Sequence, residues 1–557
     1  MQLRDANIER LADTVFDVLI IGGGINGAVS AAALAGKGAK VALIDERDFA
    51  GFTSMHSSNL AWGGIKYMET YEFQLVRQLC KSRNHLLKHY PSTVQEIRFF
   101  TTIRKGFRWH PLLLWLGTWL YWLIGNCYTR PPRLLSKRKI QTEEPVVDTT
   151  HVTGGFVYSD AYLYDNDARF VFNFIRTAMD RGCVAANYVR AETASRADQE
   201  GELWKVQARD LCGERHFEIK ARVLINAGGA FADRLNQTLQ QQTEHHHVFS
   251  KGIHLIVDRV TPNRQVLAFF ADDGRLFFAI PMGARTCIGT TDTRVEDPHT
   301  EVTEEDRKFV LDNINKCLQL DKPLSKEDII AERCGVRPLV IKADGGGNRD
   351  FLQLSRKHEI DVNRATRLIT IFGGKLTDCI NVGDEICEYV QQMDITLPAP
   401  REKWYGEPSA DIRAAFFRQA ERIGLDRLTP PSSTEPLSTR YWRRYGAEAI
   451  TLLKQIQADP RQAELLIQGT EYTRCELQLA AQREMITKLE DFLRRRSKIA
   501  LVVRKADIKH SQGLMEACEI LFGDQAQQKF DEYFVDSGSV ENGIDWADIS
   551  HSKALNW

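Results

Sequence analysis

The sequence has no excess of charge of either sign and no long apolar run. Its 73 Lys and Arg residues balance 74 Asp and Glu residues, which gives a net charge of −1 over 557 residues. This balance argues against a nucleic-acid-binding protein and against an acidic tail protein. No run reaches the roughly 20 apolar residues of a membrane-spanning helix, and residues 1–15 lack the apolar core of a secretory signal.

Paired cysteines are missing as well. The chain has 11 cysteines, an odd number, and none lies in a Cys-x-x-Cys pair or in a Cys/His cluster with zinc spacing. We therefore expect a reducing compartment, mostly buried thiols and no metal site. The run His245-His246-His247 would alternate between the two faces of an extended chain and chelate poorly, so we predict an exposed loop there.

Internal repeats and low-complexity tracts are also absent. The 43% hydrophobic and 26% charged residues are typical of a folded chain. A length of 557 residues is sufficient for two large domains and a smaller one.

A strand, a helix and a second strand open the chain. Residues 16–21 are apolar and β-branched, which predicts a buried parallel strand. Residues 28–37 are Ala-rich and predict a helix, and residues 40–44 predict the next strand. The order predicts a β-α-β unit, and a Gly-x-Gly-x-x-Gly sequence lies between its first strand and its helix.

Each glycine of this sequence has its own physical task. Gly22 allows the tight turn, Gly24 lets a pyrophosphate approach the backbone, and Gly27 lets helix and strand pack closely. The pyrophosphate then lies at the helix N-terminus. Asp45 ends the second strand, where it can accept hydrogen bonds from an adenosine ribose. The unit therefore predicts an adenine dinucleotide site.

Two later segments favour FAD over NAD. Residues 221–230 predict a strand followed by a turn of small residues, where a flavoprotein chain returns to the dinucleotide. Residues 368–377 predict a strand, a Gly pair and the start of a helix that continues through Tyr389. The positive end of that helix would stabilise the negative charge near N1 and O2 of a reduced flavin.

Motifs in order along nearly the whole chain resemble those of FAD-dependent glycerol-3-phosphate dehydrogenases and the related glycerophosphate oxidases. They are IIGGGINGA (20–28), SSNLAWGGIKYMETYEF (57–73), YSDAYLYDNDARF (158–170), INAGGAFAD (225–233), KGIHLIV (251–257), IGTTDT (288–293), GVRPL (335–339), FGGKLT (372–377) and LEDFLRRRSKIAL (489–501). The last resembles a helix of that family's C-terminal domain.

The resemblance implies an α/β fold: a doubly wound, Rossmann-like FAD-binding domain, an antiparallel β substrate cap domain and a C-terminal helical domain. Pro-bearing breaks at 397–400 and 429–433 suit that division. The expected bounds are 14–100 (FAD-binding, first part), 101–169 (cap and membrane-surface segment), 170–245 (FAD-binding, second part), 246–334 (substrate cap), 335–397 (FAD-binding, third part) and 401–557 (C-terminal helices).

The resemblance also implies a reaction and the residues that perform it. The family oxidises sn-glycerol 3-phosphate to dihydroxyacetone phosphate by hydride transfer to flavin N5. His254 matches a histidine that faces the substrate, and histidine is suited to proton transfer near neutral pH. Arg337 and Lys375 match positions that bind the substrate. Without the resemblance, a structural alternative stays open for each residue. His254 could be a hydrogen-bonded strand histidine, Arg337 could form a structural salt bridge, and Lys375 could lie on the surface.

The expected cofactor contacts extend along the whole dinucleotide. They are Gly22, Gly24, Ile25, Asn26, Gly27, Asp45, Glu46, Thr53, Ser57, Ser58, Val189, Ala227, Gly228, Gly374, Lys375, Leu376 and Thr377. Thr290, Thr291 and Asp292 match a family stretch at the edge of the site, and a strand-end turn capped by Asp explains them equally well.

Two residues of the expected substrate site depart from the family pattern His-Gly-Gly-Leu-Arg-Tyr. Trp62 replaces the histidine and Lys66 replaces the arginine, whereas Tyr67 is retained. Lysine binds phosphate as a point charge, and an indole cannot act as a base. The departures leave two alternatives open: an FAD-dependent dehydrogenase or oxidase of another small hydroxy or amino acid, and a flavin-bearing binding or regulatory protein without turnover.

One apolar run predicts contact with a membrane surface. Residues 112–124 are 13 residues long, about 20 Å as a helix, too short for the ~30 Å hydrocarbon core. Trp, Tyr, Lys and Arg residues in and around this run are typical of a membrane interface, although a helix buried on the cap domain is the alternative. With the resemblance, this implies a cytoplasmic protein, peripheral at the inner face of the cell membrane, with quinone as electron acceptor. A homodimer stays open, and no nucleic acid partner is expected.

Overall fold

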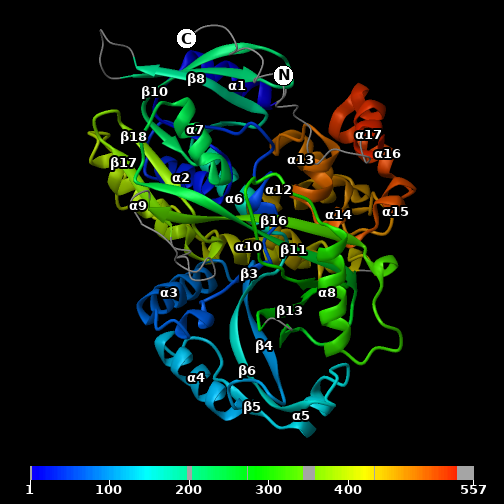
Figure 1. Ribbon diagram of the computed structural model, residues 1–557. Coiled ribbons are helices and arrows are strands. Elements are labelled where there is room, and N and C mark those ends of the chain that lie inside the picture. The colour runs from blue at the N-terminus through cyan, green and yellow to red at the C-terminus, as the bar shows by residue number, and fades with distance from the viewer. Residues whose placement is uncertain (1–2, 197–202, 272–273, 343–357, 432, 536–557) are drawn as a thin grey trace.

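Two β-sheets and a C-terminal helical region make up the molecule (Figure 1). The computed structural model describes residues 3–196, 203–271, 274–342, 358–431 and 433–535. Helix α4 and strand β5 lie at one end of the molecule, α1 and β8 lie at the other, and α13 to α17 lie to one side (Figure 1).

The first sheet has a parallel centre with the order β18-β10-β1-β2-β7. Strand β17 pairs antiparallel with β18, and β8 and β9 extend β10 in the same way. The strands are β1 (Val15–Ile21), β2 (Val41–Ile44), β7 (Val184–Ala186), β8 (Val189–Arg196), β9 (Trp204–Asp210), β10 (His216–Asn226), β17 (Glu359–Asn363) and β18 (Leu368–Phe372). Because β1, β10 and β18 are parallel neighbours, the loops that follow them meet at one edge.

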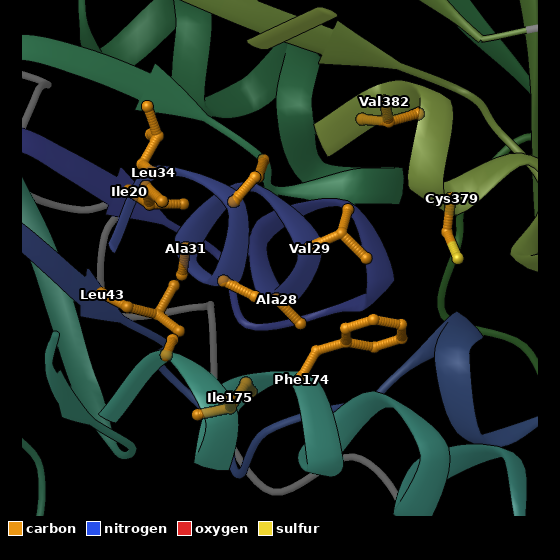
Figure 2. Close-up of a cluster of buried hydrophobic side chains, with 14 of the residues drawn as sticks. Ile20, Ala28, Val29, Ala31, Leu34, Leu43, Phe174, Ile175, Cys379 and Val382 are labelled. Carbon is orange, nitrogen blue, oxygen red and sulfur yellow. The ribbon is translucent and has the colours of Figure 1, made fainter. Parts of the chain in front are cut away.

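Helix α2 (Ile25–Gly36) is buried between α6 (Asp167–Asp180) and α9 (Cys379–Gln391). Its side chains lie among those of α6 and α9 in the hydrophobic cluster of Figure 2, where Ala28 lies close to Phe174. Small side chains let the three helices approach closely, and every residue of α2 from Asn26 to Gly36 is buried. This packing fixes the position of the α2 N-terminus below the edge where the loops meet.

The second sheet is mainly antiparallel, with the order β15-β11-β14-β13-β12-β4-β6-β3, and β16 and β5 pair with β11 and β6. Strands β4 and β12 are its parallel neighbours. The strands are β3 (Leu60–Ala61), β4 (Val94–Arg104), β5 (Arg133–Leu135), β6 (Val152–Leu163), β11 (His245–Asp258), β12 (Gln265–Phe270), β13 (Leu276–Met282), β14 (Arg285–Gly289), β15 (Thr293–Val295) and β16 (Ala331–Lys342).

The three consecutive histidines begin β11, so the prediction of an exposed loop is wrong. His245 and His247 are buried on the same face. The Nδ1 atom of His245 lies 2.6 Å from Asp361, and that of His247 lies 3.1 Å from Asp233. Alternation along the strand therefore gives two structural histidines with carboxylate partners. Within the described residues, no group of three or more His, Cys, Asp or Glu side chains is placed to hold a metal ion.

Helices cover both sheets. They include α1 (Leu3–Asp13), α3 (Phe73–His89), α4 (Pro111–Ile124), α5 (Lys137–Glu143), α7 (Ala232–Thr238) and α8 (Glu304–Cys317). The predicted helix over the apolar run is confirmed as α4, whose buried residues are Pro111, Thr118 and Tyr121. No helix among the described residues is long and apolar enough to span a membrane.

The C-terminal region is helical, as predicted. Its helices are α10 (Ala410–Arg422), α11 (Leu437–Tyr445), α12 (Ala449–Ala458), α13 (Arg474–Arg483), α14 (Ile499–Val502), α15 (Lys505–Lys509), α16 (Leu514–Phe522) and α17 (Ala526–Val535). A single π-helical segment, Asp491–Arg496, precedes α14.

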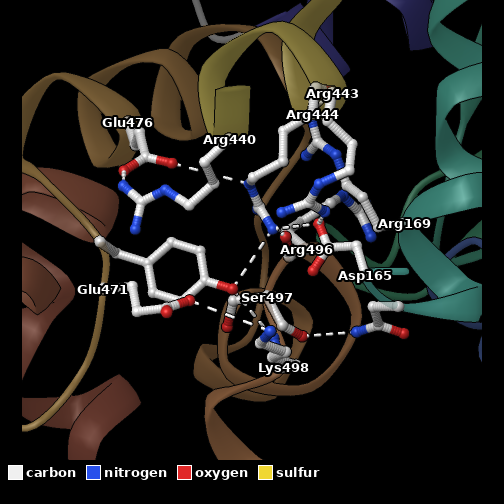
Figure 3. A network of polar contacts seen from close by, with 12 residues as sticks. Asp165, Arg169, Arg440, Arg443, Arg444, Glu471, Glu476, Arg496, Ser497 and Lys498 are labelled. Atoms are coloured by element: carbon white, nitrogen blue, oxygen red, sulfur yellow. Dashed lines mark hydrogen bonds and ion pairs between the residues drawn. The ribbon is translucent and has the colours of Figure 1, made fainter. Parts of the chain in front are cut away.

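A buried network of ion pairs joins this region to the start of α6 (Figure 3), and further ion pairs join it to the loop after β2. Asp165, just before α6, lies 2.9 Å from Arg443 and 2.7 Å from Arg444. Arg495 and Arg496 of the π-helical segment bind Asp48 at 2.7 and 2.8 Å. The guanidinium groups of these two arginines lower the pKa of the Asp48 carboxyl against the opposing effect of burial. The C-terminal region is thus attached through Asp48 to the loop that follows β2.

Candidate active site

The loop after β1 requires glycine at two positions. Gly22 has a φ of 111°, and its N–H donates a 2.8 Å hydrogen bond to the Ile44 carbonyl of β2. A Cβ atom on Gly27 would overlap the carbonyl oxygen of Gly22. The left-handed turn and the close packing of α2 against it together explain two of the three glycines.

The third glycine borders an open cavity. A Cβ atom on Gly24 would meet only Ser54 Oγ, at 3.2 Å, among the described atoms within 4 Å. Ser54 Oγ also accepts a 3.0 Å hydrogen bond from the Ile25 N–H at the start of α2. The cavity beside Gly24 has a volume of about 360 Å³. A helix N-terminus with open space before it is suited to a pyrophosphate.

Asp45 is held by backbone donors at the other side of this cavity. Its Oδ2 accepts from the Gly23 N–H at 2.6 Å and its Oδ1 from the Arg47 N–H at 2.7 Å. Burial nevertheless raises the pKa of Asp45 to about 7, because desolvation outweighs these hydrogen bonds. The neighbouring Glu46 carboxylate lies 3.4 Å from Arg190.

Eight of the expected cofactor residues line this one cavity. They are Gly22, Gly24, Asp45, Glu46, Thr53, Val189, Ala227 and Gly228. Ser57 lies beyond it, where its N–H donates to Asp167 at 2.8 Å, and Ser58 follows Ser57 on the same segment before β3. The structure therefore gathers the residues expected at the adenosine and pyrophosphate in one place.

The loop after β18 adjoins α2 through a side chain. Asn26 donates a 3.0 Å hydrogen bond to the Gly373 carbonyl, and the Gly373 N–H donates to His247 Nε2 at 3.1 Å. Gly373 and Gly374 both have positive φ, at 62° and 101°. A 3₁₀ turn, Leu376–Asp378, follows and leads into α9. The predicted single helix is thus a 3₁₀ turn that contains Leu376 and Thr377, followed by α9.

Lys375 of this loop reaches the segment that departs from the family pattern. Its Nζ donates a 2.9 Å hydrogen bond to the Tyr67 hydroxyl and lies 4.4 Å from the centre of the Tyr67 ring. The Trp62 ring lies 6.3 Å from that of Tyr67. Lys66, by contrast, is exposed. The structure therefore brings together three of the four residues expected here.

His254 and Arg337 come from the paired strands β11 and β16. His254 is 3% exposed, and within the described part of the chain neither of its ring nitrogens has a hydrogen-bond partner. The pKa of His254 is lowered to about 3, chiefly by burial and also by the positive charges of the nearby Arg333 and Arg337. A buried imidazole with both nitrogens unpartnered is suited to bind a polar group of a substrate.

Arg337 lies across Gly252, where a Cβ atom would overlap its guanidinium. Its Nη2 donates to Thr290 Oγ1 at 3.1 Å, and its Nη1 lies 3.6 Å from Asp292 Oδ1 and 3.4 Å from the Thr291 carbonyl. The turn at 290–292 therefore orients Arg337.

Sequence reasoning missed two residues of this site, Ser54 and Arg333. Arg333 faces His254 in the register of β11 and β16, is 1% exposed, and donates to Asn59 Oδ1 at 2.8 Å. The period of two along a strand places it on the face of Arg337, four residues later, and that spacing could have identified it. Ser54 lies in the hydroxyl-rich run 53–58, and that composition could have identified it as a residue of the site.

Comparison with known proteins agrees with this geometry. The model of the FAD dependent oxidoreductase family matches residues 17–368, and that of the C-terminal domain of alpha-glycerophosphate oxidase matches residues 412–528. The chain is 31% identical to an aerobic glycerol-3-phosphate dehydrogenase of Bacillus subtilis over 70% of this chain and 69% of that protein. It is 30% identical to glycerol-3-phosphate dehydrogenase 2 of Mycobacterium bovis, over 88% and 82%.

The chain belongs to the FAD-dependent glycerol-3-phosphate dehydrogenase family. Its fold is similar to that of the glycerol-3-phosphate dehydrogenase from Bacillus halodurans complexed with FAD, with a TM-score of 0.71, 23% identity and 96% of both chains covered. The L-alpha-glycerophosphate oxidase of Mycoplasma pneumoniae, with FAD bound, has a TM-score of 0.52 at 17% identity over 71% of this chain and 98% of that one.

The cofactor of this oxidoreductase is therefore FAD, as predicted. The residues present fit it, because the cavity at Gly24 and the N-terminus of α2 suit the pyrophosphate, and Asp45 adjoins the adenosine end. The predicted fold class is also confirmed.

Proposed function

We propose that the protein oxidises sn-glycerol 3-phosphate to dihydroxyacetone phosphate and passes the electrons to quinone at a membrane surface. The observation that carries this proposal is the buried, unpartnered His254 beside Arg337, on the strands that face the flavin-binding loops. Relatives named as glycerol-3-phosphate dehydrogenases, at about 30% identity, support the choice of substrate.

Two cations are available for the substrate phosphate. Arg337 offers a planar guanidinium, which the turn at 290–292 orients, and Lys375 offers an ammonium group held by Tyr67. A phosphate dianion between them would exchange these contacts for charge-assisted hydrogen bonds. We assign Lys66 no contact with the phosphate, because its side chain is exposed.

His254 is the group proposed to take the hydroxyl proton. Its imidazole is neutral, since burial and two neighbouring guanidinium groups hold its pKa at about 3. A substrate dianion bound at Arg337 would offset those positive charges and raise the pKa, so that His254 becomes an effective base when substrate is present. When bound, FAD accepts the hydride at N5.

Helix α4 supports the membrane part of the proposal. Leu112, Leu113, Leu116, Leu120 and Leu123 are exposed on one face of this helix. Lys137, Arg138 and Lys139 of α5, at the same end of the molecule, are exposed as well. Apolar side chains and cations at the same end of a protein are suited to the boundary between headgroups and acyl chains. We place the protein at the inner face of the cell membrane on this basis.

Anaerobic reduction of the purified FAD-bound protein tests the reaction. We expect glycerol 3-phosphate to bleach the flavin absorbance near 450 nm, and His254→Gln to slow the bleaching by about 10²–10⁴-fold with the flavin still bound. His246→Gln, on the same strand, is the matched control. Bleaching by other hydroxy or amino acids alone would instead favour the alternative substrate class, which the indole at Trp62 supports. No bleaching by a broad panel would overturn both readings.

Quinone transfer and surface attachment need a separate test. We expect the protein to sediment with phospholipid vesicles and to reduce a quinone analogue dissolved in them faster than it reduces oxygen. Replacing Leu116 and Leu120 by Gln removes two exposed apolar side chains and should abolish sedimentation, whereas bleaching by substrate should persist. Sedimentation of this variant at the level of the wild type would contradict the role given to α4.

A further inference from the structure

The two faces of α4 have different surroundings. The five leucines of the outer face are between 45% and 56% exposed. On the inner face, Thr118 and Tyr121 are 1% and 2% exposed. Pro111, Thr118 and Tyr121 are the buried residues of this 14-residue helix, which packs against β6 and α3. The outer apolar face of α4 is therefore available to an external contact, whereas Leu114, Trp115 and Ile124 are partly buried and pack against the core.

The hydroxyl of Tyr121 belongs to a buried polar cluster. It lies 2.8 and 2.9 Å from the two carboxylate oxygens of Asp160, on β6, and 3.2 Å from Nη1 of Arg83, on α3. Arg83 Nη1 donates to Asp160 at 2.7 Å, and the Gly63 N–H donates to the same carboxylate at 3.0 Å. Asp160 and Arg83 are 0% and 1% exposed. One carboxylate thus joins α3, α4 and the residue that follows Trp62.

Gly63 is in direct contact with Tyr121. A Cβ atom on Gly63 would overlap the Tyr121 hydroxyl oxygen, and it would lie 2.8 Å from Cys80 Sγ. No flexible side chain therefore separates α4 from the backbone of this segment. The same segment leads through Gly64, with a φ of 79°, to Tyr67, which holds Lys375.

We propose that Tyr121 and Asp160 are positioning residues that couple the outer face of α4 to the substrate-side segment 62–67. In this proposal, which rests on the surface attachment proposed above, an anionic phospholipid bilayer that binds α4 also sets the position of Tyr67 and Lys375. The bilayer is the occupant because the exposed leucines of α4 and the exposed cations of α5 lie at the same end of the molecule (Figure 1). A shift of α4 on binding moves the Tyr121 hydroxyl, and Gly63 follows through direct contact and the shared carboxylate.

Coupling of this kind requires that the bilayer favours one position of α4 over another. Five leucines at the headgroup boundary fix the depth and tilt of the helix, whereas in water only the contacts of its inner face restrain it. The consequence is a higher affinity for the phosphate of the substrate on the membrane than in solution.

Hydrogen–deuterium exchange of the full-length, FAD-bound protein tests the coupling without substrate. Vesicles of phosphatidylcholine with phosphatidylglycerol should slow exchange in the segment 60–68 as well as in α4. Tyr121→Phe, which removes only the hydroxyl, should still bind the vesicles and protect α4, but should lose the protection of 60–68. Tyr128→Phe is the matched control, because Tyr128 follows α4 and is 50% exposed; it should respond as the wild type does.

Steady-state kinetics give the second readout. With the wild type, the same vesicles should lower the KM for glycerol 3-phosphate several-fold with little change in kcat, and Tyr121→Phe should abolish the vesicle-dependent change in KM. A merely structural role of Tyr121 would change stability and leave this dependence intact.

The outcomes separate the two proposals. If the wild type does not bind vesicles, the surface attachment fails, and the coupling fails with it. If it binds and exchange in 60–68 is unchanged, the coupling is overturned while the attachment stands. If Tyr121→Phe responds as the wild type does, Tyr121 is not the link. The exchange measurement on the wild type decides the question by itself if the variant does not fold, and it does not depend on which substrate bleaches the flavin.

Discussion

The nucleotide end and the substrate end of the proposed cofactor site are built in different ways. At the nucleotide end, backbone atoms and the absence of Cβ atoms shape the site. Gly22 and Gly27 allow the tight turn, and Gly24 leaves open space before α2. At the substrate end, long side chains from separate elements meet, with Lys375 on Tyr67 and Arg337 on the turn at 290–292. The first end is encoded in six adjacent residues, whereas the second depends on the register of strands far apart in the chain.

The comparison predicts that a single methyl group at the nucleotide end has the largest effect. Gly27→Ala should abolish FAD binding, because its Cβ would overlap the Gly22 carbonyl oxygen. Gly117→Ala, in α4, is the control, since its Cβ would meet nothing within 4 Å in the described structure. We expect that control to bind FAD fully and to gain about 0.5–1 kcal/mol of stability. The flavin absorbance per mole of purified protein checks both, and a yellow Gly27→Ala protein would refute the prediction.

A second change breaks the link between the C-terminal region and the loop that follows β2. Asp48→Ala leaves Arg495 and Arg496 buried without their shared carboxylate and should lower the free energy of unfolding by about 3–5 kcal/mol. Asp258→Ala removes an exposed partner of Arg285 and should cost less than about 1 kcal/mol. Urea denaturation measures both. Equal losses would show that the buried pair contributes no more than a surface pair.

At the substrate end, we expect a substitution of Arg337 to weaken the binding of substrate and to leave the amount of bound flavin unchanged. Arg337→Gln should raise the KM for glycerol 3-phosphate by about tenfold or more, because it removes a charged hydrogen-bond donor, about 1.5–3 kcal/mol. The flavin should stay bound, since Arg337 contacts Thr290 and Asp292 and not the nucleotide cavity. Arg294→Gln, on exposed β15, should leave the KM unchanged. Loss of flavin from Arg337→Gln would erase the distinction between the two ends.

The last prediction concerns the pH dependence of the apoprotein. The pKa of Asp45 is about 7 in the folded chain and near 3.8 when exposed, so the folded state binds more protons between these values. The contribution of Asp45 to stability should therefore fall as pH rises from about 4 to about 7 and stay level above. Asp45→Asn should flatten this part of the stability curve, measured by urea denaturation at each pH. A curve identical to that of the wild type would show that Asp45 does not titrate in this range.

The β-α-β unit and the gathering of its residues around one cavity could be predicted because their signals are local. The strand at 16–21, the glycines and Asp45 lie within 30 residues, and the motif carries its own geometry. The prediction of a loop at 245–247 is wrong for a physical reason. A run of polar side chains is typical of a loop, but alternate histidines of a strand can be buried when carboxylates from distant elements face them.

The substrate end could be predicted only through the resemblance. Which lysine faces inward, Lys375 or Lys66, depends on turns that no periodicity reveals. Arg333 carried a period-two signal, but the cluster of Tyr121, Asp160 and Arg83 joins residues up to 77 positions apart. Their partnership is a product of tertiary packing, and the sequence offers no spacing from which to infer it.

The order of strands in the first sheet has a consequence for biosynthesis. Strand β1 ends at Ile21, yet β18, whose following loop lies at the same edge of the sheet and is proposed to complete the FAD site, begins at Leu368. At roughly 5–20 residues per second, a ribosome needs about 20–70 s to make the intervening chain. Through that interval the nascent polypeptide holds a half-built nucleotide site, so the flavin can be captured only late in translation or after release.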